Sequence, residues 1–270
     1  MSHVPNPLTA LGAVPGLPPG SLITRPVRRR LRPARQEPLL WMSDGPVDAP
    51  ACTYPAPPGL QAVLLHDRPH LEGWWNTEAL DPDRASDPDD HDVEHVLRDY
   101  WNAVIPEPEE GEEAEDEELI APFGRAWPGL AAAGAPAEGA EEAAAALARE
   151  SIRSGWFGSP RLALVPAERG ADVPAVLGWS GPLNHDNDTA RISTVLRSWE
   201  DRYGARILAL GFDRLDLYAA APPRTLAEAL PLAAEHFAFC PDNVWQGSGT
   251  LRAYAEEALV GSAHWSFWWD

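Results

Sequence analysis

The most regular pattern of apolar and polar positions in the chain lies between residues 188 and 204. Its apolar members recur every three or four residues, which predicts a helix with one buried face. They are Ile192, Val195, Leu196, Trp199 and Tyr203. Asp188 can accept hydrogen bonds from the free N–H groups at the helix start, and Gly204 suits its end. The stretch therefore predicts an amphipathic helix that packs on a core.

Shorter apolar runs on either side of this helix predict strands. Residues 162–166 are typical of a short strand. Residues 206–212 and 215–221 flank a turn at Asp213-Arg214, and this arrangement predicts a β-hairpin.

Two more helices are predicted between the hairpin and the end of the chain. Thr225 with Glu228 three residues later forms a capping box, which marks a helix start. Pro231 either kinks this helix or shifts its boundary. Residues 250–259 predict the last helix, and Gly261 ends it.

The chain closes with SAHWSFWWD, which predicts a terminal strand. Because side chains alternate along a strand, Trp265, Phe267 and Trp269 share one face, and we expect the helices to bury it. The opposite face carries His264, Ser266 and Trp268. On that face, Trp268 is expected either to cover the sheet or to contact a ligand.

The N-terminal half shows fewer clear elements. Residues 38–44 predict a buried strand, and residues 59–67 form a second apolar element of uncertain type. A helix is predicted from Asp92 to the residue before Pro106. Residues 138–150 have high helix propensity but few apolar side chains, so we expect a solvent-exposed helix there.

Together these elements predict an α+β fold with a mixed β-sheet packed against amphipathic helices. The C-terminal part would follow the order β-α-β-β-α-α-β, with helices on one face of its sheet and a smaller N-terminal α/β region before it. The expected organisation is a flexible lead-in over 1–20, an N-terminal region over 21–105, an acidic linker with an Ala-rich helix over 106–154, and a self-contained C-terminal domain over 155–270.

The net charge of −20 comes mainly from two segments. Residues 107–118 hold nine acids and no base, and residues 78–94 hold eight acids and one Arg. Such runs are usually solvated. Residues 25–35 hold six Arg, but no nucleic-acid motif accompanies them, so we expect no nucleic-acid partner.

The chain has no long apolar run and no signal peptide pattern, so we expect no membrane contact. Its two cysteines suit a reducing compartment, and a soluble cytoplasmic protein is expected. No cofactor motif is present, and the oligomeric state is left open.

One candidate catalytic group lies on the helix before Pro241. His236 and Cys240 are four residues apart and share a helix face, and Asp242 follows. A Cys–His pair can generate a reactive thiolate, with a carboxylate orienting the imidazole. The alternative interpretation is a small buried cysteine among aromatic residues.

A candidate ligand site lies in the polar turn before the first helix described above. Its residues Asn184, His185 and Asp186 could receive a polar ligand, or serve only as turn and cap residues. Asn243, Gln246 and Trp268 are expected to line the same pocket.

The sequence HDVEH at 91–95 matches the reversed zinc-protease pattern H-x-x-E-H. His91 and His95 would be metal ligands and Glu94 the general base. The pattern is short and no third ligand can be named, so we expect no metal site.

Four segments, WEDRYGARILALGFDRLDL, AAPPRTLAEAL, HFAFCPDNVWQGSGTL and WSFWWD, resemble a bacterial family common in actinobacteria. It is catalogued as domain of unknown function 4253, and the resemblance covers the last 110 or so residues. It implies a domain boundary near residue 155 and no activity.

The function expected from these features is a non-enzymatic binding or protein-interaction module. One version is a toxin-neutralising partner whose acidic face meets a basic target. The alternative is a thiol-dependent hydrolase that uses Cys240 with His236 or His185.

Overall fold

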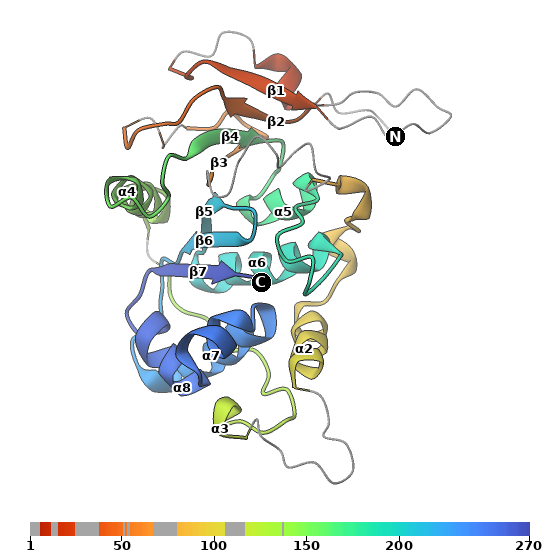
Figure 1. The fold of residues 1–270 in the computed structure, drawn as a ribbon, viewed down its shortest axis with the longest axis vertical. Helices are drawn as coiled ribbons and strands as arrows, with labels where there is room; N and C mark the ends of the chain where they lie inside the picture. The colour runs from red at the N-terminus through yellow and green to blue at the C-terminus, as the bar shows by residue number, and fades with distance from the viewer. Residues whose placement is uncertain are drawn as a thin grey trace.

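The computed structural model describes residues 6–11, 16–24, 38–50, 52, 55–66, 80–105, 117–136 and 138–270. Within these residues seven strands form one mixed sheet in the order β1-β2-β4-β3-β5-β6-β7 (Figure 1). The strands are β1 (Gly20–Thr24), β2 (Pro38–Ser43), β3 (Gln61–Leu65), β4 (Arg161–Val165), β5 (Arg206–Leu210), β6 (Arg214–Tyr218) and β7 (His264–Trp268). Neighbouring strands are antiparallel except β3 and β5, which are parallel. The predicted α+β class and the hairpin β5–β6 are confirmed.

The strand order corrects the expectation of a self-contained C-terminal domain. β4 lies between β2 and β3, and β3 separates β4 from β5. A strand with the apolar pattern of β4 needs a neighbour on each side to satisfy its backbone groups, and both neighbours come from the N-terminal half. The ranges 21–105 and 155–270 therefore share one sheet.

In chain order, the helices follow β3, β4, β5–β6 and the segments between them. They are α2 (Val93–Val104), α3 (Glu117–Ile120), α4 (Ala140–Arg153), α5 (Val173–Leu177), α6 (Thr189–Tyr203), α7 (Leu226–Phe239) and α8 (Leu251–Tyr254). Short 3-10 turns are η1 (Pro7–Ala10), η2 (Pro82–Arg84), η3 (Pro88–Asp90) and η4 (Gly170–Asp172), and π-helical turns are η5 (Asn243–Ser248) and η6 (Ala255–Leu259).

Local sequence explains where the long helices start and stop. The Asp188 carboxylate accepts from the Ala190 N–H, and Gly204 ends α6 in the left-handed conformation. Thr225 and Glu228 form the predicted capping box of α7. The helix continues through Pro231, so the proline does not mark its boundary. The predicted last helix becomes α8 followed by the π-helical turn η6.

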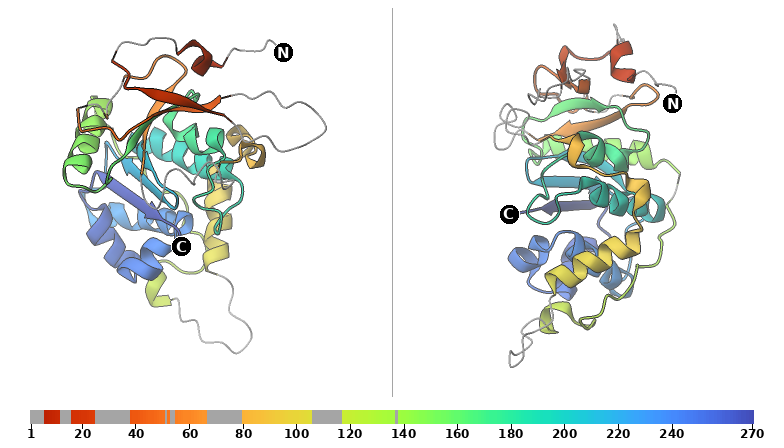
Figure 2. Two further views of the ribbon diagram at one scale, coloured as in Figure 1. Left: turned by 45° about the horizontal axis from the view of Figure 1, so that its top comes forward. Right: turned by 90° about the vertical axis from the view of Figure 1, so that its right-hand side faces the viewer.

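The main core lies between one face of the sheet and helices α2, α5, α6, α7 and α8. The predicted burial of the tail is confirmed, because Trp265, Phe267 and Trp269 are at most 4% exposed. The Trp199 ring of α6 stacks on Phe267 with centroids 5.4 Å apart. Figure 2 shows α2 running alongside α7, and the two helices belong to the same layer on this face of the sheet. The tail is therefore part of the core.

Helix α4 covers the second face of the sheet, which corrects two expectations. It buries Ala144 and Ala148 against apolar side chains of the central strands, including Leu64 and Leu208. Helices thus lie on both faces, and α4 is half buried because small alanine side chains allow a close approach to the sheet. In Figure 1, α4 lies across the sheet from α5.

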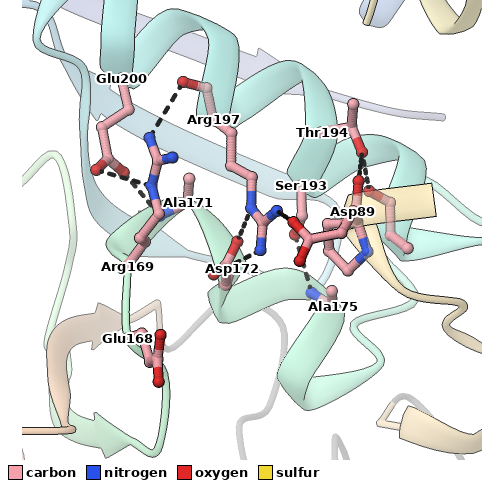
Figure 3. A network of polar contacts seen from close by, with 12 residues as sticks. Asp89, Glu168, Arg169, Ala171, Asp172, Ala175, Ser193, Thr194, Arg197 and Glu200 are labelled. Carbon is pink, nitrogen blue, oxygen red and sulfur yellow. Dashed lines mark hydrogen bonds and ion pairs between the residues drawn. The ribbon is translucent and has the colours of Figure 1, made fainter. Parts of the chain in front are cut away.

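A charged network fastens α6 to the segments before it (Figure 3). The Arg197 guanidinium bonds both carboxylate oxygens of Asp172, at 2.5 and 3.0 Å, and also contacts Asp89. The hydrogen bonds that Arg197 donates to Asp172 raise the pKa of the guanidinium despite its partial burial. Arg169 reaches Glu200 one turn further along α6. These contacts fix the helix relative to η3 and η4.

Several sequence features fall outside the described residues. They are the Arg-rich run at 25–35, most of the acidic run at 107–118, and residues 1–5 and 12–15 of the lead-in. Within the described residues, no helix is both long enough and apolar enough to cross a membrane.

Candidate functional site

The predicted polar turn borders a pocket of about 470 Å³ between α2 and the start of α6. Of the six predicted ligand-binding residues, His185 and Asp186 line it. Its other lining residues are Arg84, Asp99, Tyr100, Ala103, Asn187, Asp188 and Arg191. Asn184 instead donates to the backbone oxygen of Asp270, at 3.0 Å, and holds the turn beside the C-terminus.

Three side chains organise this pocket. The Asp186 carboxylate accepts from the Tyr100 hydroxyl at 2.7 Å and lies 3.3 Å from an Arg191 nitrogen. The Arg191 guanidinium lies over the Tyr100 ring, 4.9 Å from its centroid, and pairs with Asp99 at 2.9 Å. Burial raises the pKa of Tyr100 well above its ordinary value, and Asp186 adds to the effect. The phenol therefore remains a donor to Asp186.

His185 is the chemically unusual residue of the pocket. Burial lowers its pKa although Asp186 and a hydrogen bond to the Ala238 backbone act against this, so the imidazole is neutral at pH 7. Nε2 is buried and has no hydrogen-bond partner among the described residues. The bond to Ala238 must then involve Nδ1–H, which leaves Nε2 as an acceptor with an open lone pair. A hydrogen-bond donor is what this position lacks.

The predicted thiol group has another role. Cys240 donates to the Trp268 backbone oxygen at 2.9 Å and approaches the Asn243 side-chain oxygen at 3.6 Å. Asn243 donates to the Ser266 backbone oxygen at 2.8 Å, and Asp242 accepts from the Asp270 N–H at 3.1 Å. These side chains satisfy backbone groups on the outer edge of β7, which is an end strand of the sheet.

His236 takes no part in that edge. Its Nδ1 lies 3.0 Å from the Tyr254 hydroxyl, and burial, reinforced by the Arg202 charge, lowers the pKa of the imidazole well below its ordinary value. Burial likewise raises the pKa of the Cys240 thiol, so it stays protonated. The predicted constellation of Cys240, His236 and Asp242 therefore does not converge on a reactive thiolate.

The remaining predicted ligand residues lie at the same edge. Gln246 donates to Asp242 at 3.1 Å, and Trp268 is partly buried on the second sheet face. None of Asn243, Gln246 and Trp268 lines the pocket beside His185.

We predict that iodoacetamide does not modify Cys240 in the native protein at pH 8. The thiol is fully buried, donates a hydrogen bond and has a raised pKa, so thiolate is scarce and inaccessible. Peptide mass spectrometry after timed labelling measures this, with a urea-unfolded sample as the positive control. Labelling of native Cys240 at the rate of the unfolded chain would restore the thiol-enzyme hypothesis.

The H-x-x-E-H pattern does not form a metal site. His91 precedes the helix, which begins at Val93, and its Nε2 lies 2.6 Å from the Ser86 hydroxyl. Glu94 pairs with Arg98 at 3.0 Å. The two histidines therefore do not share a helical turn. Across the described ranges, no three His, Cys, Asp or Glu side chains gather in a way that could hold a metal ion.

The sequence did not reveal a second polar centre, which surrounds the fully buried Asp216 on β6. One carboxylate oxygen lies 2.8 Å from His66 Nε2. The other lies 2.8 Å from His264 Nε2 and 2.9 Å from Trp156 Nε1. Ala209 of β5 pairs with Asp216, and β5 lies between β6 and β3, the strand that ends just before His66. The carboxylate thus joins β3, β6, β7 and the turn after α4.

The chemistry of this centre follows from the charge on Asp216. Burial alone would raise its pKa, but hydrogen bonds from His264 and His66 outweigh that effect, and the pKa lies well below the ordinary value. An ionised carboxylate accepts only, so both imidazoles direct Nε2–H toward it. The centre fixes the orientation of both rings, with His66 also packed edge-on against Phe157 at 5.0 Å.

One signal in the sequence could have pointed to this centre. In the predicted strand LDLY, alternation places Asp216 on the face opposite Leu215 and Leu217, between two other strands. An acid inside a central strand is rarely left without partners. The partners themselves could not be named, since His66 is 150 residues away along the chain.

Comparison with known proteins adds one finding. Residues 161–270 match the family model described as Domain of unknown function (DUF4253). No curated protein and no solved structure matches the chain. The matched segment runs from β4 to the C-terminus, so it contains His185 and Asp216 but leaves out Tyr100, Trp156 and His66.

Proposed function

We propose that the protein is a non-enzymatic binding module whose pocket beside His185 accepts a positively charged side chain of a partner protein. The observation that carries the proposal is the lining of this pocket, where the carboxylates of Asp99, Asp186 and Asp188 surround a neutral His185 imidazole. An arginine or lysine side chain brings N–H donors that carboxylate oxygens accept.

The charge of the pocket supports a cationic group. Its lining contains the carboxylates of Asp99, Asp186 and Asp188 against the guanidinium groups of Arg84 and Arg191. The whole chain carries a net charge of −20, which attracts basic proteins and repels nucleic acids. A basic protein target, as in toxin neutralisation, fits both features.

The alternative of a thiol-dependent hydrolase has no comparable support. Cys240 is buried, protonated and hydrogen-bonded to the backbone of β7. Both cysteines are free, which is consistent with a reducing, cytoplasmic location in a bacterium.

We predict that acetyl-arginine amide binds the full-length protein saturably and shifts the His185 imidazole resonances in NMR spectra. The neutral isostere acetyl-citrulline amide should bind more weakly, since it keeps the donors but loses the charge. The affinity for the arginine probe should fall as salt is raised. If acetyl-glutamate amide shifts His185 and the arginine probe does not, the proposal is wrong.

Two variants sharpen this experiment. Asp99→Asn removes a carboxylate at the pocket mouth that is 58% exposed, so folding is not at risk. It should weaken the arginine probe about two- to fivefold, as expected for one exposed charge. Glu257→Gln removes an exposed acid outside the pocket and should leave the affinity unchanged.

A further inference from the structure

We propose that a second pocket, beneath α4, binds a small molecule with an apolar body and a cationic amine head. The pocket has a volume of about 800 Å³ and lies between the first half of α4 and the starts of β3 and β5. That volume is in the range of small-molecule sites. It shares no lining residue with the pocket beside His185, so this inference is independent of the proposed function.

Part of the lining of this pocket is apolar and only partly buried. It comprises Pro57 in the loop before β3, Ala62 of β3, Ala145 of α4 and Ile207 of β5. An apolar ligand body packed on these side chains would remove their apolar surface from water.

The rim of the pocket is acidic. Its lining includes four glutamates, Glu141, Glu142, Glu168 and Glu200, and two arginines, Arg169 and Arg206. Arg206 pairs with Glu141 at 2.5 Å, and Arg169 pairs with Glu200 at 3.3 Å. Both arginines are therefore neutralised.

The other two glutamates are available for a ligand. Figure 3 shows the Glu168 carboxylate apart from Arg169 and Glu200, without a contact to the residues drawn. Glu142 is exposed at the start of α4, and no ion pair of Glu142 or Glu168 occurs among the described residues. A cationic head at this rim gains an opposite charge, whereas a carboxylate head would be repelled.

The test is calorimetric titration of the full-length protein with octylammonium, octanoate and octanol, each below its micelle concentration. Octylammonium should bind saturably and at least about tenfold more tightly than octanoate, a difference of about 1.4 kcal/mol. Equal or tighter binding of octanoate, or no saturable binding of octylammonium, would overturn the proposal.

Variants on one helix locate the site. Ala145→Phe places a ring in the pocket and should weaken octylammonium at least about tenfold. Ala146→Phe changes the exposed side of the same helix turn and should alter the affinity less than about twofold. Equal effects of the two variants would contradict the site. Glu168→Gln, an exposed change that does not threaten folding, should weaken octylammonium and leave octanol unaffected.

Discussion

Replacing Asp216 with alanine is expected to lower the free energy of unfolding by about 3–5 kcal/mol, because it removes the common acceptor of three N–H donors and leaves them unsatisfied. The change leaves His66, His264 and the Trp156 indole N–H without their common acceptor. Urea unfolding at pH 7, followed by circular dichroism, measures the loss. A loss below about 1 kcal/mol, as for a surface substitution, would show that the centre is not a structural junction.

Asp216→Asn separates hydrogen bonding from charge. The amide keeps one oxygen acceptor for His264 and Trp156, so this variant should lose less stability than the alanine variant. The folded-state pKa of Asp216 is lowered, so its ionisation stabilises the native state above the unfolded-state pKa and this contribution is lost as the pH falls through the folded-state pKa. The stability difference between wild type and Asp216→Asn should therefore shrink below about pH 4.

The second large effect is expected at Glu235, which is fully buried on α7. Its carboxylate accepts from two Arg202 nitrogens at 2.8 and 2.5 Å, from Trp199 at 2.8 Å and from the Ala131 N–H at 2.6 Å. Glu235→Ala leaves the largely buried Arg202 charge unpaired and should cost about 3–5 kcal/mol by the same urea assay. A much smaller loss would mean that Arg202 finds water or another acceptor.

A double-mutant cycle isolates this ion pair. Arg202→Met and Glu235→Gln each leave one partner behind, whereas the double variant removes both charges and keeps an amide oxygen for Trp199. We expect the double variant to be more stable than the sum of the single losses implies, by about 1–3 kcal/mol. Strict additivity would contradict a direct coupling between the two side chains.

The local elements could be predicted because each depends on short-range patterns. The periodicity of α6, the capping box of Thr225 and the alternation of the aromatic tail all specify structure within a few residues. Strand order is different, because the neighbours of β4 lie in another part of the chain. The apolar run at 162–166 is compatible with many neighbouring strands. Its position between β2 and β3 therefore cannot be predicted from the sequence of the strand itself.

The candidate site shows the same division. The polar turn with His185 was found because Asx-rich turns before a helix have a recognisable sequence, but its partner Tyr100 comes from α2, 86 residues before Asp186. Cys240 has the residue types of a nucleophilic pair. Only the structure shows its S–H directed at the Trp268 backbone and not at His236. The residue types at Cys240 and His236 indicate thiolate chemistry, whereas the burial of the thiol and the direction of its S–H do not support it.

The position of β4 between β2 and β3 also bears on how the chain folds during translation. β2 and β3 both leave the ribosome well before β4 is made, so the edge of each strand that pairs with β4 has no partner while the nascent chain grows. The unpaired backbone N–H and C=O groups at these edges, around Trp41 and Leu64, remain templates for intermolecular pairing until Arg161–Val165 emerges. Synthesis of this protein thus passes through an interval in which chaperone shielding matters most, and chains interrupted before β4 are the ones most prone to aggregate.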